Sequence, residues 1–197
     1  MEGRDTAEHP RDRSLAAEQR LLAEGIPAYL NAMMAIQELR QNIQKRCRRV
    51  LCDGLEEFAA TIGMTLDTTQ IEDYSYPEGI SALATADEAW LGVKIPLQST
   101  GTAYVTLVWS QGNGRDDQSP DINAYVAIEL RDRSLFERVW EIVQREEPQV
   151  VSGYSRIIEL YEPVPPDRIP RFDDILLELM EEWSRLWQRV GIPLGAA

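Results

Sequence analysis

Three segments of the chain alternate apolar residues with other residues, and this pattern constrains the fold more strongly than any other feature of the sequence. They are residues 90–97, 102–110 and 122–130, and Ser-Thr-Gly at 99–101 separates the first two. Because successive side chains of a strand point to opposite faces, each segment predicts a strand with one apolar face. The short turn predicts a hairpin, and a further strand is expected over 155–163.

Apolar residues spaced by three and four predict the helices. We expect a short helix over 15–24, a break at Gly-Ile-Pro (25–27), and a long helix over 27–62, since proline suits the first turn of a new helix. Two more helices are expected over 134–147 and 171–190. The predicted order is helix, three strands, helix, strand, helix. It indicates an α+β fold with a long N-terminal helix and a four-stranded, antiparallel or mixed sheet with helices packed on it.

The chain length of 197 residues suits a single domain preceded by a polar tail. We expect a disordered tail over 1–14 and one domain over 15–197, which consists of a helical part (15–63), a connector (64–89) and the sheet with its helices (90–191). Within the connector, "DYSYPEG" at 73–79 is interpreted as a turn or loop, because it is rich in turn-forming residues.

Acidic residues dominate the charge, with 33 Asp and Glu against 20 Lys and Arg and a formal net charge of −13. A field of this sign repels phosphate backbones and disfavours general nucleic-acid binding. No apolar run is long enough to span a membrane. Cys47 and Cys52 lie on one predicted helix, about 140° apart around its axis, and so cannot form a disulfide with each other. Reduced cysteines and a polar N-terminus without a signal-peptide pattern predict a cytoplasmic location.

Few residues offer catalytic chemistry. His9 is the only histidine and lies in the predicted tail, which removes the mechanisms that depend on histidine. Glycine-rich phosphate-binding motifs are absent, and the spacing of the cysteines does not match a metal-binding pair. We therefore expect neither a cofactor nor a bound metal, and the balance favours a protein that is not an enzyme.

One motif points toward nucleases. Pro120-Asp121 is followed by Glu129-Leu130-Arg131, and the order helix, three strands, helix, strand resembles the core of PD-(D/E)xK nucleases over roughly 30–162. This resemblance implies Asp121 and Glu129 as metal ligands, with Arg131 in the place of the motif's lysine. In that family, the two carboxylates lie on neighbouring strands and share a metal ion.

The spacing of the motif conflicts with such a site. Asp121 begins the third predicted strand and Glu129 lies in the same strand, so the two are separated by about 26 Å. Both would have to come within about 2.1 Å of one Mg²⁺, and Arg131 is too basic to transfer a proton near neutral pH. An active site would need a broken strand, or Asp116 or Asp117 folded back from the preceding loop. A degenerate relative of these nucleases stays an alternative.

The second face of the predicted sheet is rich in aromatic residues. Alternation places ten side chains opposite the apolar face: Trp90, Lys94, Tyr104, Thr106, Val108, Tyr125, Glu129, Ile157, Glu159 and Tyr161. Either the long helix or the last helix covers this face, or the face is open and marks a binding site. The binding residues predicted on it are Trp90, Lys94, Tyr104, Tyr125 and Tyr161.

The stretch "RQNIQKRCRR" at 40–49 is a second candidate surface, because it is basic in an acidic chain. On a helix, Lys45, Arg48 and Arg49 point away from the apolar side. Three interpretations are open: a solvated helix face, a docking stripe for an acidic partner or for the protein's own acidic surface, and a nucleic-acid contact. The last is disfavoured because no aromatic residues for base stacking interleave with the basic ones.

The last predicted helix combines acidic residues with tryptophans. Asp173, Asp174, Glu178, Glu181 and Glu182 gather toward its N-terminal half, which either complements the helix dipole or mimics a nucleic acid. Trp183 and Trp187 are one turn apart and are expected in the core or in an interface.

These features predict a cytoplasmic protein-interaction module without enzymatic activity, such as an adaptor, an inhibitor or an accessory subunit of a larger assembly. Its partner is expected to be another protein rather than nucleic acid or a membrane, and the long helix also predicts a homodimer. The alternatives are a degenerate PD-(D/E)xK nuclease-like protein that processes nucleic acid, and an acidic mimic that blocks a DNA-binding surface.

Overall fold

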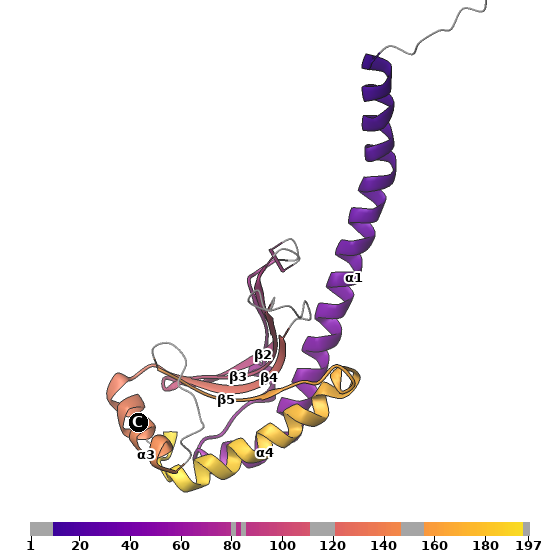
Figure 1. Cartoon of the computed structure of the whole chain (residues 1–197). Coiled ribbons are helices and arrows are strands. Elements are labelled where there is room, and N and C mark those ends of the chain that lie inside the picture. Colours follow the sequence, from indigo (N-terminus) through magenta and orange to yellow (C-terminus); the bar gives the residue numbers. More distant parts are fainter. Residues whose placement is uncertain (1–9, 80–81, 84–85, 111–120, 147–155, 195–197) are drawn as a thin grey trace, which may run out of the picture. The chain divides into compact units, whose positions relative to one another are not determined.

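The computed structural model describes residues 10–79, 82–83, 86–110, 121–146 and 156–194, and for residues 10–17 the helical backbone alone (Figure 1). Residues 111–120, which belong to the loop predicted over 111–121 before the third strand, and residues 1–9 of the predicted tail, with His9, lie outside these ranges. By compactness the chain divides into two units, Met1–Leu39 and Arg40–Ala197, and each is described by itself.

The elements follow one another along the chain as three α-helices, two 3-10 helices and five strands in the described residues. They are α1 (Pro10–Thr61), η1 (Thr68–Gln70), β1 (Glu72–Tyr76), β2 (Glu88–Leu97), β3 (Gly101–Ser110), β4 (Asp121–Leu130), α3 (Arg133–Glu146), β5 (Ile157–Pro163), η2 (Ile169–Arg171) and α4 (Phe172–Val190). This is the α+β class that the sequence predicts, with the long N-terminal helix in place. None of the described helices combines the length and the apolar character that a membrane span requires.

Helix α1 is continuous through the position where a break was predicted. Pro27 lies inside the helix, although proline lacks the backbone N–H that the helix would use there and crowds the preceding turn. The prediction of two helices over 15–24 and 27–62 was therefore wrong. The residues on both sides of Pro27 are rich in alanine, leucine and glutamate, which are strong helix formers and offset one missing hydrogen bond.

The sheet has five strands in the order β1-β2-β3-β4-β5, and every neighbouring pair is antiparallel. The prediction of four strands was wrong because β1 lies in the stretch that was interpreted as a turn. β1 is an edge strand with one neighbour, and none of its side chains is fully buried. Such a strand needs no alternation of apolar residues, so the sequence pattern that predicts the other strands is missing from it.

The second unit's part of helix α1 and helices α3 and α4 contribute to one core on one side of the sheet. Cys47 and Val50 of α1, Val139 of α3 and Ile175 of α4 belong to the same buried cluster as the apolar strand residues such as Val105. Figure 1 shows α4 running beneath the sheet, and shows the strands bent so that the face opposite this helix is concave.

The two tryptophans of the last helix belong to this core. Trp183 and Trp187 are 0% and 1% exposed, and their ring centroids lie 5.9 Å apart in an edge-to-face arrangement. Their predicted place in the core is confirmed.

Candidate functional site

The concave face of the sheet carries aromatic side chains from all five strands. We call this surface the aromatic face and define it by six residues: Tyr74 and Tyr76 of β1, Trp90 of β2, Tyr104 of β3, Tyr125 of β4 and Tyr161 of β5. The register explains why they share a face. Tyr74 lies opposite Gly92, Gly92 opposite Thr106, Thr106 opposite Tyr125, and Tyr125 opposite Tyr161, so one row crosses the whole sheet.

The rings of the aromatic face contact one another. The ring centroids of Trp90 and Tyr125 are 5.1 Å apart, and those of Tyr125 and Tyr161 are 5.2 Å apart in a stacked pair. Tyr74 and Tyr104 form a separate edge-to-face pair at 5.2 Å. These are the separations of favourable aromatic pairs, so the rings hold each other in place and form a pre-arranged surface.

Small residues lie between the aromatic ones in the middle of this face. Thr106, Val108 and Ala127 are buried, and Gly92 lies between Tyr74 and Thr106 in the row described above. A Cβ atom at Gly92 would lie 2.1 Å from the backbone oxygen of Val105. β2 and β3 therefore approach each other so closely at this point that glycine is required, and the concave surface is shaped by the backbone.

A hollow of about 490 Å³ opens in the aromatic face. It is lined by Tyr74, Tyr76, Trp90, Tyr104, Ala127, Glu129, Arg156, Ile157 and Glu159. The lining therefore comes from every strand and from Arg156, which precedes β5. Four aromatic side chains line it, and the charged groups in it are two carboxylates and one guanidinium.

Hydrogen bonds orient the phenol and the indole at the hollow. The hydroxyl of Tyr104 donates to Oε2 of Glu129 at 3.0 Å, and the indole N–H of Trp90 donates to Oε1 of Glu88 at 2.7 Å. Burial, assisted by the charge of Glu129, raises the pKa of Tyr104 well above its usual value. Burial, followed by the charges of Glu159, Tyr161 and Glu88, raises the pKa of Tyr125 to about 12. Both phenols are therefore neutral at neutral pH and can donate hydrogen bonds.

Glu159 differs from the other carboxylates of this face. It is partly buried on β5, and burial alone raises the pKa of its carboxyl group. Among the described residues, no group donates a hydrogen bond to this carboxylate or forms an ion pair with it. The ionised carboxylate is thus partly deprived of water without receiving a partner in exchange, which is an unfavourable state for a charged group.

Two of the predicted binding residues on this face, Trp90 and Tyr104, line the hollow, whereas Tyr125 and Lys94 do not. Tyr125 contacts the ring of Trp90. The ammonium group of Lys94 lies 3.3 Å from a carboxylate oxygen of Glu72, its partner in the β1–β2 register. Tyr161 is exposed at the edge of the sheet. The residues that sequence reasoning missed are Tyr74 and Tyr76, and the spacing of two in Glu72-x-Tyr74-x-Tyr76 is the signal that could have revealed them.

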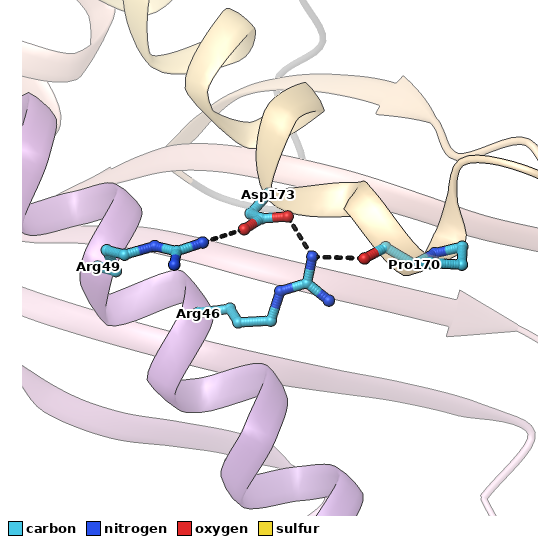
Figure 2. Close-up of polar contacts among 4 residues, drawn as sticks. All are labelled: Arg46, Arg49, Pro170 and Asp173. Atoms are coloured by element: carbon cyan, nitrogen blue, oxygen red, sulfur yellow. Dashed lines mark hydrogen bonds and ion pairs between the residues drawn. The ribbon is translucent and has the colours of Figure 1, made fainter.

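The basic stretch over 40–49 contacts the protein's own acidic residues. Arg48 forms an ion pair with Asp73 at 2.9 Å and donates to the backbone oxygen of Ile71 at 2.9 Å. Figure 2 shows Arg46 and Arg49 converging on the carboxylate of Asp173. Lys45 is exposed. Two of the three predicted binding residues therefore hold α1 against β1 and α4, which matches the interpretation as a stripe for the protein's own acidic surface.

The nuclease-like motif lies on one unbroken strand. Asp121 pairs with Ser110 at one end of β4, and Glu129 pairs with Thr102 near the other end, which corresponds to a separation of about 26 Å. Arg131 lies just beyond the strand, where its backbone N–H donates to the oxygen of Thr100 at 2.9 Å. In the part of the chain that the structure describes, no group of three His, Cys, Asp or Glu side chains is arranged to hold a metal ion. Asp116 and Asp117 lie outside that part.

Comparisons of this chain with protein-family models, with curated proteins and with solved structures each find no match.

Proposed function

We propose that this chain is a non-enzymatic protein-interaction module that binds a segment of a partner protein on its aromatic face. The observation that carries the proposal is the concave, pre-arranged surface of tyrosines and a tryptophan with a hollow of about 490 Å³. An adaptor, an inhibitor or an accessory subunit would use such a surface in the same way.

The composition of the surface favours a protein partner. Tyrosine and tryptophan are enriched in protein interfaces because each supplies a large, rigid contact area together with one polar group. Tyr76 is 59% exposed and Tyr161 is 42% exposed, so both rings are available at the edges of the sheet, while Trp90 and Tyr125 between them are half-buried. A partner that covered these rings would gain the burial of apolar area that drives association.

The charges near the surface disfavour nucleic acid as the ligand. Glu72, Glu88, Glu129 and Glu159 lie on the same face as the rings, and the whole chain carries a formal net charge of −13. A phosphate backbone would be repelled by these carboxylates, although aromatic rings can stack on bases.

The test is purification of a tagged chain from its native host, with identification of both protein and nucleic acid in the eluate. The double variant Trp90→Ala/Tyr125→Ala should lose a stoichiometric protein partner that the wild-type chain retains. Leu177→Ala, which removes an exposed apolar side chain from α4, is the control and should retain the partner. Retention of the partner by the double variant, or nucleic acid as the sole bound species, would overturn the proposal.

A separate observation favours self-association of the first unit. Helix α1 exposes large apolar side chains between residues 21 and 39, among them Leu22, Ile26, Tyr29 and Leu30. Leu22, Tyr29 and Ile36 are spaced by seven residues, which is the repeat that places apolar side chains along one seam of a coiled coil. We propose a second copy of this chain as the partner of that seam.

The two alternative functions have weaker support. A nuclease-like site would have to unite Asp121 and Glu129 from opposite ends of β4. Cleavage of DNA or RNA with Mg²⁺ or Mn²⁺ that is lost in Glu129→Ala would support it. An acidic mimic would use the exposed carboxylates of α4, but Asp173 is already paired with Arg46 and Arg49. Binding to a basic surface that collapses with added salt would support the mimic.

A further inference from the structure

We propose that the hollow in the aromatic face receives a cationic side chain, lysine or arginine, from the bound partner segment. This inference rests on the proposed function and adds the chemistry of the residue that the hollow selects. It is argued from the two carboxylates that line the hollow, the aromatic side chains that line it with them, and the incomplete neutralisation of the carboxylate charge.

The two carboxylates come from neighbouring strands. Glu129 of β4 lies opposite Ile157, and Glu159 of β5 lies opposite Ala127. Glu129 and Glu159 are therefore diagonal neighbours on the same face, a relationship that separates backbone positions by about 7–8 Å. Ala127, opposite Glu159 and next to Glu129 on this face, supplies only a methyl group, and both carboxylates line the hollow of about 490 Å³ that an inserted group would enter.

The aromatic side chains that line the hollow also suit a lysine or arginine side chain. Tyr74, Tyr76, Trp90 and Tyr104 all line it, and the faces of such rings attract cations through their quadrupoles. The methylene groups of lysine or arginine would pack against the rings while the charged end reaches the carboxylates. A neutral apolar side chain would also pack against the rings, but it would leave the carboxylates further dehydrated and without a charged partner.

The charges already present do not neutralise the site. Glu129 accepts a hydrogen bond from the neutral hydroxyl of Tyr104, and Glu159 has no partner among the described residues. Arg156 also lines the hollow, but its guanidinium donates to the backbone oxygen of Arg131. Lys94, the nearest other cation in the register, is paired with Glu72. Two carboxylates and one guanidinium leave one negative charge in excess.

The burial of Glu159 supports a cationic ligand independently of the aromatic side chains that line the hollow. Burial raises the pKa of its carboxyl group, because water is partly excluded and no donor replaces it. A bound cation would provide the missing partner. In the free protein, no interaction offsets the dehydration of this carboxylate. An ion pair with a cationic ligand would offset it, so a positively charged ligand is favoured over a neutral one of the same shape.

The test uses the whole chain and two small probes, one of which lacks the terminal ammonium group of the other. The probes are N-acetyl-lysine N-methylamide and its neutral analogue N-acetyl-norleucine N-methylamide, and the signal is the indole N–H resonance of Trp90, assigned with Trp90→Phe. We expect saturable shifts with the lysine probe and an apparent Kd at least tenfold lower than with the norleucine probe. An arginine probe should resemble the lysine probe.

The variant Glu129→Gln/Glu159→Gln keeps the shape of both side chains and an acceptor for Tyr104. It should reduce the preference for the lysine probe to less than about twofold, whereas Glu162→Gln, an exposed change at the end of β5, should leave it unchanged. Equal binding of both probes to the wild-type chain would overturn the inference. A preference that persists in the double variant would overturn it as well.

Failure of this inference is distinguishable from failure of the proposed function. If the protein partner depends on Trp90 and Tyr125 but is retained by the double glutamine variant, docking on the aromatic face stands and cation selection is wrong. If the probes show the expected preference while no protein partner depends on the rings, the hollow binds cations and the docking proposal is wrong.

Discussion

Arg46 of helix α1 donates a hydrogen bond to the carboxylate of Asp173 in the first turn of helix α4, across 127 residues of sequence (Figure 2). The same guanidinium donates to the backbone oxygen of Pro170 and lies 4.3 Å from the centre of the Phe172 ring. Arg49 supplies a second ion pair to the carboxylate, which is only 6% exposed at the residue level. This cluster joins α1 to α4 beneath the sheet that presents the aromatic face.

Replacement of Asp173 by asparagine should lower the free energy of unfolding by about 1–3 kcal/mol, because it leaves two guanidinium groups without their shared partner. The cost stays below that of a fully buried ion pair, since the side chains of Arg46 and Arg49 are 30% and 63% exposed. Urea unfolding measures the change. Asp174→Asn, an exposed change in the same turn, is the control and should shift the free energy by less than about 0.5 kcal/mol.

The stability contributed by Asp173 should depend on pH. Burial by itself raises the pKa of this carboxyl group, but the hydrogen bond from Arg46 and the charges of Arg46 and Arg49 outweigh burial, so its pKa is lowered from 3.8. Because this pKa is lower in the folded state than in the unfolded state, Asp173 stabilises the protein fully at pH values above its unfolded-state pKa. The stabilisation is lost as the pH falls through its folded-state pKa. The difference in unfolding free energy between wild type and Asp173→Asn should therefore shrink below about pH 4. A difference that stays constant down to pH 2 would contradict this account.

Glu159→Gln should stabilise the free protein at neutral pH. The pKa of Glu159 is raised from 4.5 by burial, so the ionised carboxylate opposes folding, and the favourable contribution of its protonated form is lost as the pH rises through the folded pKa. The melting temperature of Glu159→Gln should exceed that of wild type at pH 7, and the difference should vanish below pH 4.5. Glu162→Gln should show no such pH-dependent gain.

Gly92→Ala should destabilise the second unit by at least about 2 kcal/mol. The added Cβ atom would meet the oxygen of Val105 at 2.1 Å and the Cα atom of Thr106 at 2.7 Å, and both are backbone atoms that cannot move independently. Gly25→Ala is the control, because no atom lies within 4 Å of its added Cβ, and alanine should favour the helix by about 0.5–1 kcal/mol. Thermal unfolding of the two variants, followed by circular dichroism, compares them. A stable Gly92→Ala variant would disprove the close approach of β2 and β3.

The proposed dimer should dissociate when the apolar seam of α1 is interrupted. Leu22→Ser/Tyr29→Ser replaces two exposed apolar side chains that are seven residues apart, so the apolar area buried between two copies would be lost. Sedimentation equilibrium should give the mass of a dimer for the wild type and of a monomer for this variant. Asn31→Ser, an exposed change on the same helix, should remain dimeric, and a monomeric wild type would refute the proposal.

The features of the fold that the sequence predicts are those that depend on near neighbours in the chain. The hairpin of β2 and β3, strand β4 and helices α3 and α4 follow from alternation or from spacings of three and four, and the structure places them within a few residues of the expected bounds. Trp183 and Trp187 follow from the same helical pattern. The unbroken helix at Pro27 was missed because the helix formers around the proline outweigh its tendency to break a helix. The edge strand β1 was missed because its composition is typical of a turn, whereas pairing with β2 makes it a strand.

Alternation along each strand by itself determined that Trp90, Tyr104, Tyr125 and Tyr161 share one face, because neighbouring side chains of a strand must point to opposite sides. Only the tertiary structure decided that the described helices of the second unit pack on the other face, that Tyr74 and Tyr76 join the aromatic face, and that Glu129 and Glu159 become diagonal neighbours. The physical reason is that these relations depend on strand register and on contacts such as that of Arg46 with Asp173. Such contacts join residues far apart in sequence, and no local pattern of residues encodes them.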